Sequence, residues 1–319
     1  MSTADASGPQ DTPRYTNRKH RDWSKWALGI YFALFLVFLY LPMVLMGVLS
    51  VQGLYGAITF PFQGPVSGRW WESLFNADIP GSHANEIRAA GLQSLWLSLA
   101  AGAVVSVISF TLSMAFRRRF RGDGIAFYLI LLALMTPGFL LALGTQLFWR
   151  FIDEPTSLWK TALGTNAVWG IPFGFLVMLA VWNRYDEHIE EAARDLGADQ
   201  KRTFWEVTLP LIWTGVFGCF LFGFTLTWND YDRTLLLIGG IETQTLPLQI
   251  AALTFTAAIR PDLYALGTLT TLISILVILL LLLVIGFRLR FRASPAAQSV
   301  EEELGLVEEI HVETEEPAR

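Results

Sequence analysis

The chain has 319 residues, of which 53% are apolar and 16% are charged, and its mean hydropathy is +0.44. This composition excludes an ordinary water-soluble domain and places the chain among polytopic membrane proteins. The net charge of −5 comes from the C-terminal end, because residues 301–319 hold eight carboxylates and one arginine. We expect residues 291–319 to form a solvated acidic tail without chemistry of its own.

Six apolar segments are long enough to cross a hydrocarbon layer, which takes roughly 20 helical residues. They cover residues 26–51, 92–116, 125–148, 163–182, 209–228 and 263–287. A backbone surrounded by lipid satisfies its own hydrogen bonds as a helix. The predicted fold is therefore all-α, a polytopic membrane protein with six transmembrane helices in a domain of residues 26–290, preceded by a polar tail of residues 1–25.

Basic residues are unevenly divided between the two sides that six spans define. Of the 23 lysines and arginines, 17 fall on the side that holds both termini and the segment 183–208, and 6 fall on the other side. The positive-inside rule then places both termini and residues 183–208 in the cytoplasm. On the outer side, the apolar stretch 246–259 is too short to span a membrane, and we expect an interfacial or re-entrant helix there.

Residues 183–208 form a charged segment between the fourth and fifth spans. Ala192 and Ala193 offer a small-residue surface for close docking, and Gly197 marks a place where the chain can turn. Pro210 stands near the start of the fifth span, where a missing amide donor costs little. The pattern predicts two short helices joined by a bend and followed by a membrane helix.

The spacing in this segment resembles a known family motif. Glu191, Ala192 and Ala193 are followed by Gly197 and then by Leu209 and Pro210. This order resembles the EAA loop of the permeases of binding-protein-dependent ABC importers. The resemblance implies a type I ABC importer permease fold, with a cytoplasmic coupling helix between spans four and five. The alternative is an amphipathic surface helix with an accidental glycine and proline.

By the same resemblance, Glu191 is the polar contact to a separate ATPase and Gly197 is the bend of the coupling loop. The family implies a bacterial inner-membrane complex that contains two ATP-binding subunits, a second homologous permease and a periplasmic or lipid-anchored substrate-binding protein. Membrane lipid surrounds such a complex, and no nucleic acid takes part in it.

The chain has no recognisable catalytic or metal-binding motif. The sequence contains no G-x-x-x-x-G-K-[ST] phosphate loop and no H-E-x-x-H, and its four histidines are scattered. We therefore expect a non-enzymatic transport subunit that has no cofactor and no metal site, with ATP and Mg²⁺ bound by the partner ATPase. An ion-coupled secondary transporter is a weaker alternative, because the spans hold almost no ionisable residues.

Two further stretches point to a substrate. Residues 134–144 and 231–250 resemble the polyamine-type permeases, above all the second permease of spermidine and putrescine importers. The resemblance implies a polyamine cation as substrate. Permeases for other amines, aminophosphonates, iron or sugars share much of this pattern and remain alternatives.

A cation that leaves water needs a countercharge or an aromatic face. Trp228, Asp230, Tyr231 and Asp232 supply both at the outer end of the fifth span. The hypothesis is that Asp230 or Asp232 contacts a cationic substrate or gates its entry. In the alternative interpretation both are ordinary loop carboxylates, with Arg233 as a nearby partner, and the two aromatic residues are interface anchors.

Glycine and proline residues mark two spans. Gly170 and Gly174 flank Pro172 in the fourth span, and this small-residue spacing favours close helix packing over a hinge. Pro137 and Gly138 in the third span indicate packing in the same way, with a kink that lines the pathway as the alternative.

Overall fold

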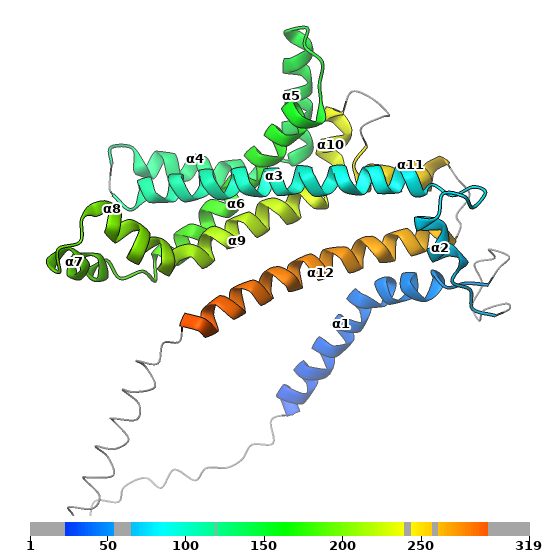
Figure 1. Ribbon diagram of the computed structural model, residues 1–319, viewed down its shortest axis with the longest axis horizontal. Coiled ribbons are helices and arrows are strands. Elements are labelled where there is room, and N and C mark those ends of the chain that lie inside the picture. Colours follow the sequence, from blue (N-terminus) through cyan, green and yellow to red (C-terminus); the bar gives the residue numbers. More distant parts are fainter. Residues whose placement is uncertain (1–22, 54–64, 119, 239–243, 257–260, 293–319) are drawn as a thin grey trace, which may run out of the picture. The chain divides into compact units, whose positions relative to one another are not determined.

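The computed structural model describes residues 23–53, 65–118, 120–238, 244–256 and 261–292. Within these ranges the regular secondary structure is helical, which confirms the all-α prediction (Figure 1). Most of both predicted tails, residues 1–22 and 293–319, lies outside the described residues. The elements, with η for a π-helical turn, are α1 (Trp23–Leu49), α2 (Arg69–Phe75), α3 (Ala84–Phe116), α4 (Asp123–Met135), α5 (Gly138–Phe151), η1 (Leu158–Ala162), α6 (Leu163–Trp182), α7 (His188–Asp195), α8 (Gln200–Arg202), η2 (Thr203–Thr208), α9 (Leu209–Trp228), α10 (Asp232–Leu237), α11 (Leu246–Thr256) and α12 (Pro261–Arg292).

The chain divides into two compact units, residues 1–45 and 46–319. The first unit contains most of α1, whose apolar side chains, Phe32 and Phe38 among them, are exposed. An apolar helix with no buried face suits an environment of lipid acyl chains. The second unit contains the other helices and both candidate sites.

Five described helical segments are long and apolar enough to cross a membrane. They are Lys25–Leu49, Ala84–Phe116, Leu158–Trp182, Gln200–Trp228 and Pro261–Leu280. A sixth span exists if the bent pair Asp123–Met135 and Gly138–Phe151 counts as one. The six predicted segments thus all correspond to long helices or, in one case, to a broken one.

The third predicted span, residues 125–148, is not one continuous helix. Helices α4 and α5 meet at an angle of 97°. The break follows from Pro137, which cannot continue the hydrogen-bond ladder and disfavours the helical conformation of the residue before it. Both Thr136 (ψ 122°) and Pro137 (ψ 126°) are extended, and the chain resumes a helix only at Gly138.

Helices α3, α6 and α9 pack side by side as the core of the second unit (Figure 1). Their contacts are made by small residues: a Cβ on Gly170 would lie 2.7 Å from Val105 Cγ2 on α3, and one on Gly174 would overlap Ser109. Hydroxyl groups join the helices too, since Ser109 Oγ donates to the Ile171 carbonyl (3.0 Å). The packing interpretation of the two glycines is confirmed.

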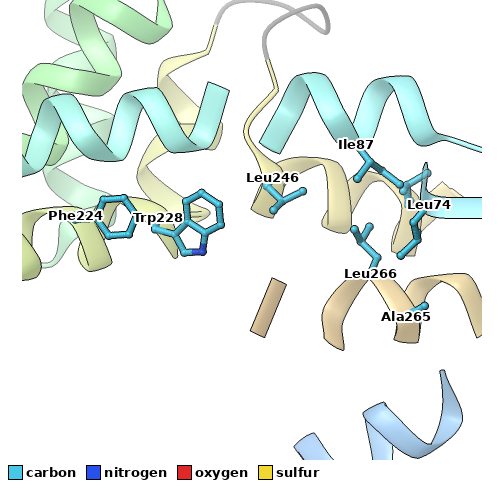
Figure 2. Packing of buried hydrophobic residues seen from close by; sticks show 8 residues of the cluster. Leu74, Ile87, Phe224, Trp228, Leu246, Ala265 and Leu266 are labelled. Atoms are coloured by element: carbon cyan, nitrogen blue, oxygen red, sulfur yellow. The ribbon is translucent and has the colours of Figure 1, made fainter. Parts of the chain in front are cut away.

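A second hydrophobic cluster joins α2, α3, α9, α11 and α12 (Figure 2). Its buried members are Leu74, Ile87, Phe224, Trp228, Leu246, Leu253, Ala265 and Leu266. Helix α11 covers most of the stretch for which a short interfacial or re-entrant helix was expected. The Leu246 amide donates to Ser94 Oγ on α3 (2.7 Å), so the start of this short helix is held against a membrane-spanning one.

Candidate functional site

The predicted coupling segment folds as a helix, a bend and a second short helix. Helix α7 ends in a Schellman motif, in which the Gly197 amide donates to the Arg194 carbonyl (2.8 Å) and the Ala198 amide donates to the Ala193 carbonyl (3.1 Å). This ending needs a left-handed residue, and Gly197 has φ +90°. The predicted bend is therefore at Gly197, and glycine suits it because it has no Cβ.

The second half of the segment leads directly into α9. Asp199 caps α8 by accepting a hydrogen bond from the Arg202 amide (2.8 Å), and the wider π-helical turn η2 follows. Leu209 and Pro210 then begin α9, which continues directly from η2, and the proline lies in its first turn. The motif residues thus lie at three places: on α7, at the bend, and at the start of α9.

Glu190, next to the motif residue Glu191, anchors the segment. It is 8% exposed, and its Oε1 accepts hydrogen bonds from Thr208 Oγ1 (2.8 Å), Tyr185 Oη (2.9 Å) and Arg117 Nη1 (3.0 Å). Its Oε2 accepts another from Arg194 Nη2 (3.3 Å). These donors come from the end of α3, the end of α6, α7 itself and η2, so one carboxylate ties four segments together.

Arg117 and the aromatic side chains around it determine the electrostatics of this anchor. The Arg117 guanidinium lies 4.4 Å from the ring centre of Trp182 and 5.3 Å from that of Tyr185. Burial by itself raises the pKa of Glu190, but hydrogen bonds from Thr208, Tyr185 and Arg117 outweigh it and hold the pKa below its ordinary value. The carboxylate is therefore charged at neutral pH.

The residues of the motif itself lie mostly on the surface. Glu191, Ala192 and Gly197 are exposed, while Ala193 is partly buried. Leu196, directly after α7, is 91% exposed, which is unusual for a large apolar side chain. A cavity of about 570 Å³ opens between this segment and the end of α3, lined in part by Arg118, Gln200 and Phe204.

At the other end of α9, Asp230 and Arg233 form a buried ion pair. Asp230 Oδ1 lies 2.8 Å from Arg233 Nη2, and Asp230 Oδ2 accepts the Thr234 amide (2.9 Å). Arg233 also donates from Nε to Asn166 Oδ1 (2.8 Å) and lies 5.2 Å from the ring centre of Trp169 on α6. The partner that the sequence suggested for Asp230 is thus in place.

The other three residues predicted at this end have different surroundings. Trp228 is 4% exposed, its ring stacks on Phe224 at 5.9 Å, and its Nε1 donates to Ser274 Oγ on α12 (2.9 Å) (Figure 2). Tyr231 is partly buried before α10, and Asp232 is exposed as the first residue of α10. Asp232 is therefore the one carboxylate of the pair that faces open space.

Sequence reasoning did not single out Glu190, Arg117 or Asn166. Glu190 is one of two adjacent glutamates, and nothing in the sequence says which one turns inward. Arg117 stands in a basic run that indicated only orientation. A weak signal existed for Asn166, since a lone amide within an apolar span needs a polar partner.

These features coincide with a match to a known family. The profile of the family described as "Binding-protein-dependent transport system inner membrane component" matches residues 107–294, which is more than half of the chain. The matched region includes α6, both candidate sites and α9. The chain belongs to this family, and it is an ABC importer permease with the helical membrane fold of that class.

Among individual proteins, the chain is similar to polyamine permeases. It is 24% identical to the spermidine/putrescine transport system permease protein PotC of Haemophilus influenzae over 240 residues, 75% of this chain and 88% of that protein. It is 26% identical to the putrescine transport system permease protein PotI of Escherichia coli over 240 residues, 73% of this chain and 81% of that protein. A crystal structure of a bacterial ABC transporter that imports alginate contains a chain with the same fold, with a TM-score of 0.63, 16% identity, and coverage of 85% of this chain and 97% of that one.

Proposed function

We propose that the chain forms the translocation pathway of an ATP-driven importer. In this proposal, residues 183–208 contact a separate ATPase and transmit its conformational changes to the membrane helices. The observation that carries the proposal is Leu196, an apolar side chain 91% exposed directly after a helix that Glu190 joins to the end of α3 and to η2. A large apolar side chain kept in water at one fixed place suits a pocket in a partner. The charge distribution of the chain supports a cytoplasmic position for this segment and for both termini.

A coupling element must move as one body with the membrane helices that it drives. Helix α7 meets this requirement because Glu190 joins it to Arg117 at the end of α3 and to Thr208 just before α9. In the proposed mechanism the motif residues Glu191, Ala192 and Ala193 face the ATPase, and Glu190 faces the permease. A push on the exposed side of α7 then moves α3 and α9 together.

The test uses the complete importer, reconstituted with its ATPase and binding protein in lipid nanodiscs. Leu196→Asp is expected to reduce binding-protein-stimulated ATP hydrolysis at least about tenfold, which corresponds to roughly 1.4 kcal/mol of docking energy. The amount of folded permease should stay unchanged, since Leu196 makes little contact with its own chain. Asp195→Ala, an exposed neighbour, is the matched control. Hydrolysis at the unaltered level in the Leu196 variant would contradict the proposal.

For the substrate we propose a polyamine of the putrescine and spermidine type. The names of the PotC and PotI relatives and the carboxylates Asp230 and Asp232 at one end of α9 support a cation. Since Asp230 already has Arg233 as a partner, Asp232 is the carboxylate available to a cation that arrives from outside. Trp228 and Tyr231 help to define this end of the pathway by supporting the turn between α9 and α10.

Uptake of radiolabelled putrescine and spermidine, compared with an aminophosphonate and a sugar, in cells with and without the gene tests the substrate. The gene should restore uptake of the two amines only, and Asp232→Asn should slow that uptake. Restored uptake of the phosphonate or the sugar alone would contradict a polyamine substrate but leave the importer intact.

The proposed assembly contains this chain, a homologous second permease, two ATP-binding subunits and a substrate-binding protein in the inner membrane of a bacterium. ATP and Mg²⁺ belong to the ATPase subunits, and this chain transforms no substrate. Co-purification with a tagged permease followed by native mass spectrometry should give one copy of each permease and two ATPases. A C-terminal fusion to green fluorescent protein should fluoresce, because the proposed C-terminus is cytoplasmic.

A further inference from the structure

Among the described residues, the buried guanidinium of Arg233 is surrounded by hydrogen-bond acceptors, an aromatic face and the backbone of Gly138. Its side chain is 10% exposed. The contacts are the Asp230 carboxylate (2.8 Å), the Asn166 amide oxygen (2.8 Å), the Leu226 carbonyl (3.1 Å) and the Trp169 ring (5.2 Å). We refer to these four groups as the cation cage.

The chemistry of the cation cage does not specify a guanidinium. One carboxylate, two neutral oxygen acceptors and the face of a tryptophan are also what a primary ammonium group needs once it leaves water. An ammonium has three donors, and the cage offers three oxygen-bearing acceptors around one site. The same set of groups can therefore bind an alkylammonium ion.

The connection between Arg233 and Asp230 is short. The two residues are three positions apart, on the turn from α9 into α10, a helix of only six residues. The ion pair itself therefore joins no two distant segments of the chain, and the contacts of Arg233 with other helices are those of its guanidinium with α6 and α5. The cage walls, by contrast, belong to the long helices α6 and α9, which carry Asn166, Trp169 and the Leu226 carbonyl.

Arg233 also touches the break in the third span. A Cβ on Gly138 would lie 3.0 Å from Arg233 Nη1 and 3.2 Å from its Cδ. The side chain thus fills the space beside the first turn of α5, directly after Pro137. Movement of the guanidinium out of the cage removes a contact that α5 has in this structure.

We propose that the cation cage is a substrate subsite for a primary ammonium group, and that Arg233 is a tethered placeholder that the ammonium displaces. The proposal rests on the proposed polyamine transport for the identity of the ligand. Without a cation, Asp230 is a buried, unpaired carboxylate, which is strongly unfavourable. Arg233 neutralises it while the pathway is empty, and exchange of one cation for another keeps the charge balanced. Departure of the guanidinium then releases α5.

Cation binding by the cage is tested first, without transport. Arg233→Ala opens the cage in the full-length purified permease, and methylammonium chloride or guanidinium chloride at about 50 mM is the probe, with sodium chloride as reference. Each probe is expected to raise the Tm of Arg233→Ala by about 2–4 °C, as a ligand present at about ten times its Kd should do. Arg88→Ala, which removes an exposed arginine, should show no such rise.

Two further variants guard against loss of folding. Asp230→Asn with Arg233→Met has no charge in the cage, is expected to fold, and should lose the response to both probes. Arg233→Lys places a tethered ammonium in the same cage and should unfold within a few degrees of the unaltered protein. A probe response that persists without Asp230, no response in Arg233→Ala, or severe destabilisation by Arg233→Lys would each overturn the cage.

Transport measurements test whether the substrate displaces Arg233 from the cation cage. With its competitor removed, Arg233→Ala should transport putrescine with a KM about tenfold lower than the unaltered importer, while Asp230→Asn should raise that KM. A KM that Arg233→Ala leaves unchanged or raises would overturn displacement by the substrate. If the unaltered importer carries no polyamine, the proposed substrate fails, and the Tm measurements still decide whether the cage binds alkylammonium ions.

Discussion

The two ends of α9 carry the same interaction in two different settings. Arg117 pairs with Glu190 near the start of α9 and lies over Trp182, while Arg233 pairs with Asp230 after its end and lies over Trp169. The Arg233 pair is buried, Arg117 of the other pair is partly buried, and both arginines face a tryptophan of α6. The residues of the first pair are 73 positions apart in the chain, whereas those of the second are three apart.

This separation decides what each pair can do. The long-range pair joins the end of α3 to α7, so breaking it detaches one segment from another. The local pair joins two residues of one turn, so exchanging its cation keeps that turn intact, and only the contacts of the Arg233 guanidinium with α6 and α5 are lost. An ATP-driven permease needs both kinds of ion pair. One keeps the helices joined beside the coupling segment, and the other can be replaced by a substrate in the pathway.

The largest expected effect on stability comes from removing the long-range pair between Arg117 and Glu190. Glu190→Ala removes the shared acceptor of Thr208, Tyr185 and Arg117 and leaves the partly buried Arg117 with only its longer contact to Glu187 (3.4 Å). We therefore expect a loss of about 3–5 kcal/mol in the free energy of unfolding. Thermal unfolding of the purified permease measures it. The adjacent Glu191→Ala, at an exposed position, should change stability by less than about 0.5 kcal/mol. Equal effects of the two substitutions would remove the distinction between an inward anchor and an outward motif residue.

The second prediction concerns the helix that supports both pairs. Helix α6 holds Trp182 at one end and Asn166 at the other, and Gly174 between them packs closely on α3. A Cβ there would overlap Ser109, so Gly174→Ala should cost about 1–3 kcal/mol by overpacking. Gly164→Ala in the same helix meets nothing within 4 Å and should be neutral or slightly stabilising. The midpoints of thermal unfolding compare the two, and a neutral Gly174→Ala would contradict the close packing.

A smaller effect is expected at the bend. Gly197 has φ +90° and open space around the position of a Cβ, so Gly197→Ala brings backbone strain of about 1–2 kcal/mol without a clash. Asparagine tolerates this conformation better, and Gly197→Asn should retain more coupled ATP hydrolysis than Gly197→Ala. If both variants hydrolyse ATP like the unaltered importer, the left-handed bend is not needed for coupling.

The smallest effect is a dependence on pH. The pKa of Glu190 is lowered in the folded protein from an ordinary value of 4.5, so its contribution to stability is complete above that value and is lost as the pH falls through the folded pKa. Stability should be insensitive to Glu190 between about pH 8 and pH 5 and should decline below about pH 4.5. Glu190→Gln should lack this acid-dependent part of the decline. Identical unfolding curves for both proteins from pH 5 to pH 3 would contradict the assignment.

Much of the fold follows from the sequence, because lipid solvation and helical hydrogen bonding are properties of each segment alone. The apolar lengths predict the spans, and the change to charged residues predicts helix, bend and helix around Gly197. The degree of the bend at Pro137 does not follow, since a proline in a membrane helix is compatible with a slight kink as well as with the observed 97°. Tertiary packing decides between these outcomes.

The candidate sites could be predicted only in part, for the same reason. The inward side chain of the pair Glu190 and Glu191 depends on where Arg117 and Thr208 lie, and both are distant in sequence. Tryptophan is a typical interface anchor in membrane proteins. In the structure, however, the indole of Trp228 is 4% exposed and donates a hydrogen bond to Ser274 Oγ on α12. Asp230 and Arg233 are local neighbours, which is why their pairing could be suggested from the sequence.

Cys219 has a practical consequence for studying the two ends of α9 together. It is the chain's single cysteine, it is 0% exposed, and its Sγ lies 3.1 Å from the Gly174 carbonyl oxygen. A maleimide or methanethiosulfonate reagent applied to the folded protein should therefore leave it unmodified. Cysteines introduced at the exposed positions Asp195 and Leu235, which the proposals leave without a role, can carry two spin labels in an otherwise native background. One interspin distance would then report, during a single transport cycle, how movement at the coupling segment corresponds to movement beside the cation cage.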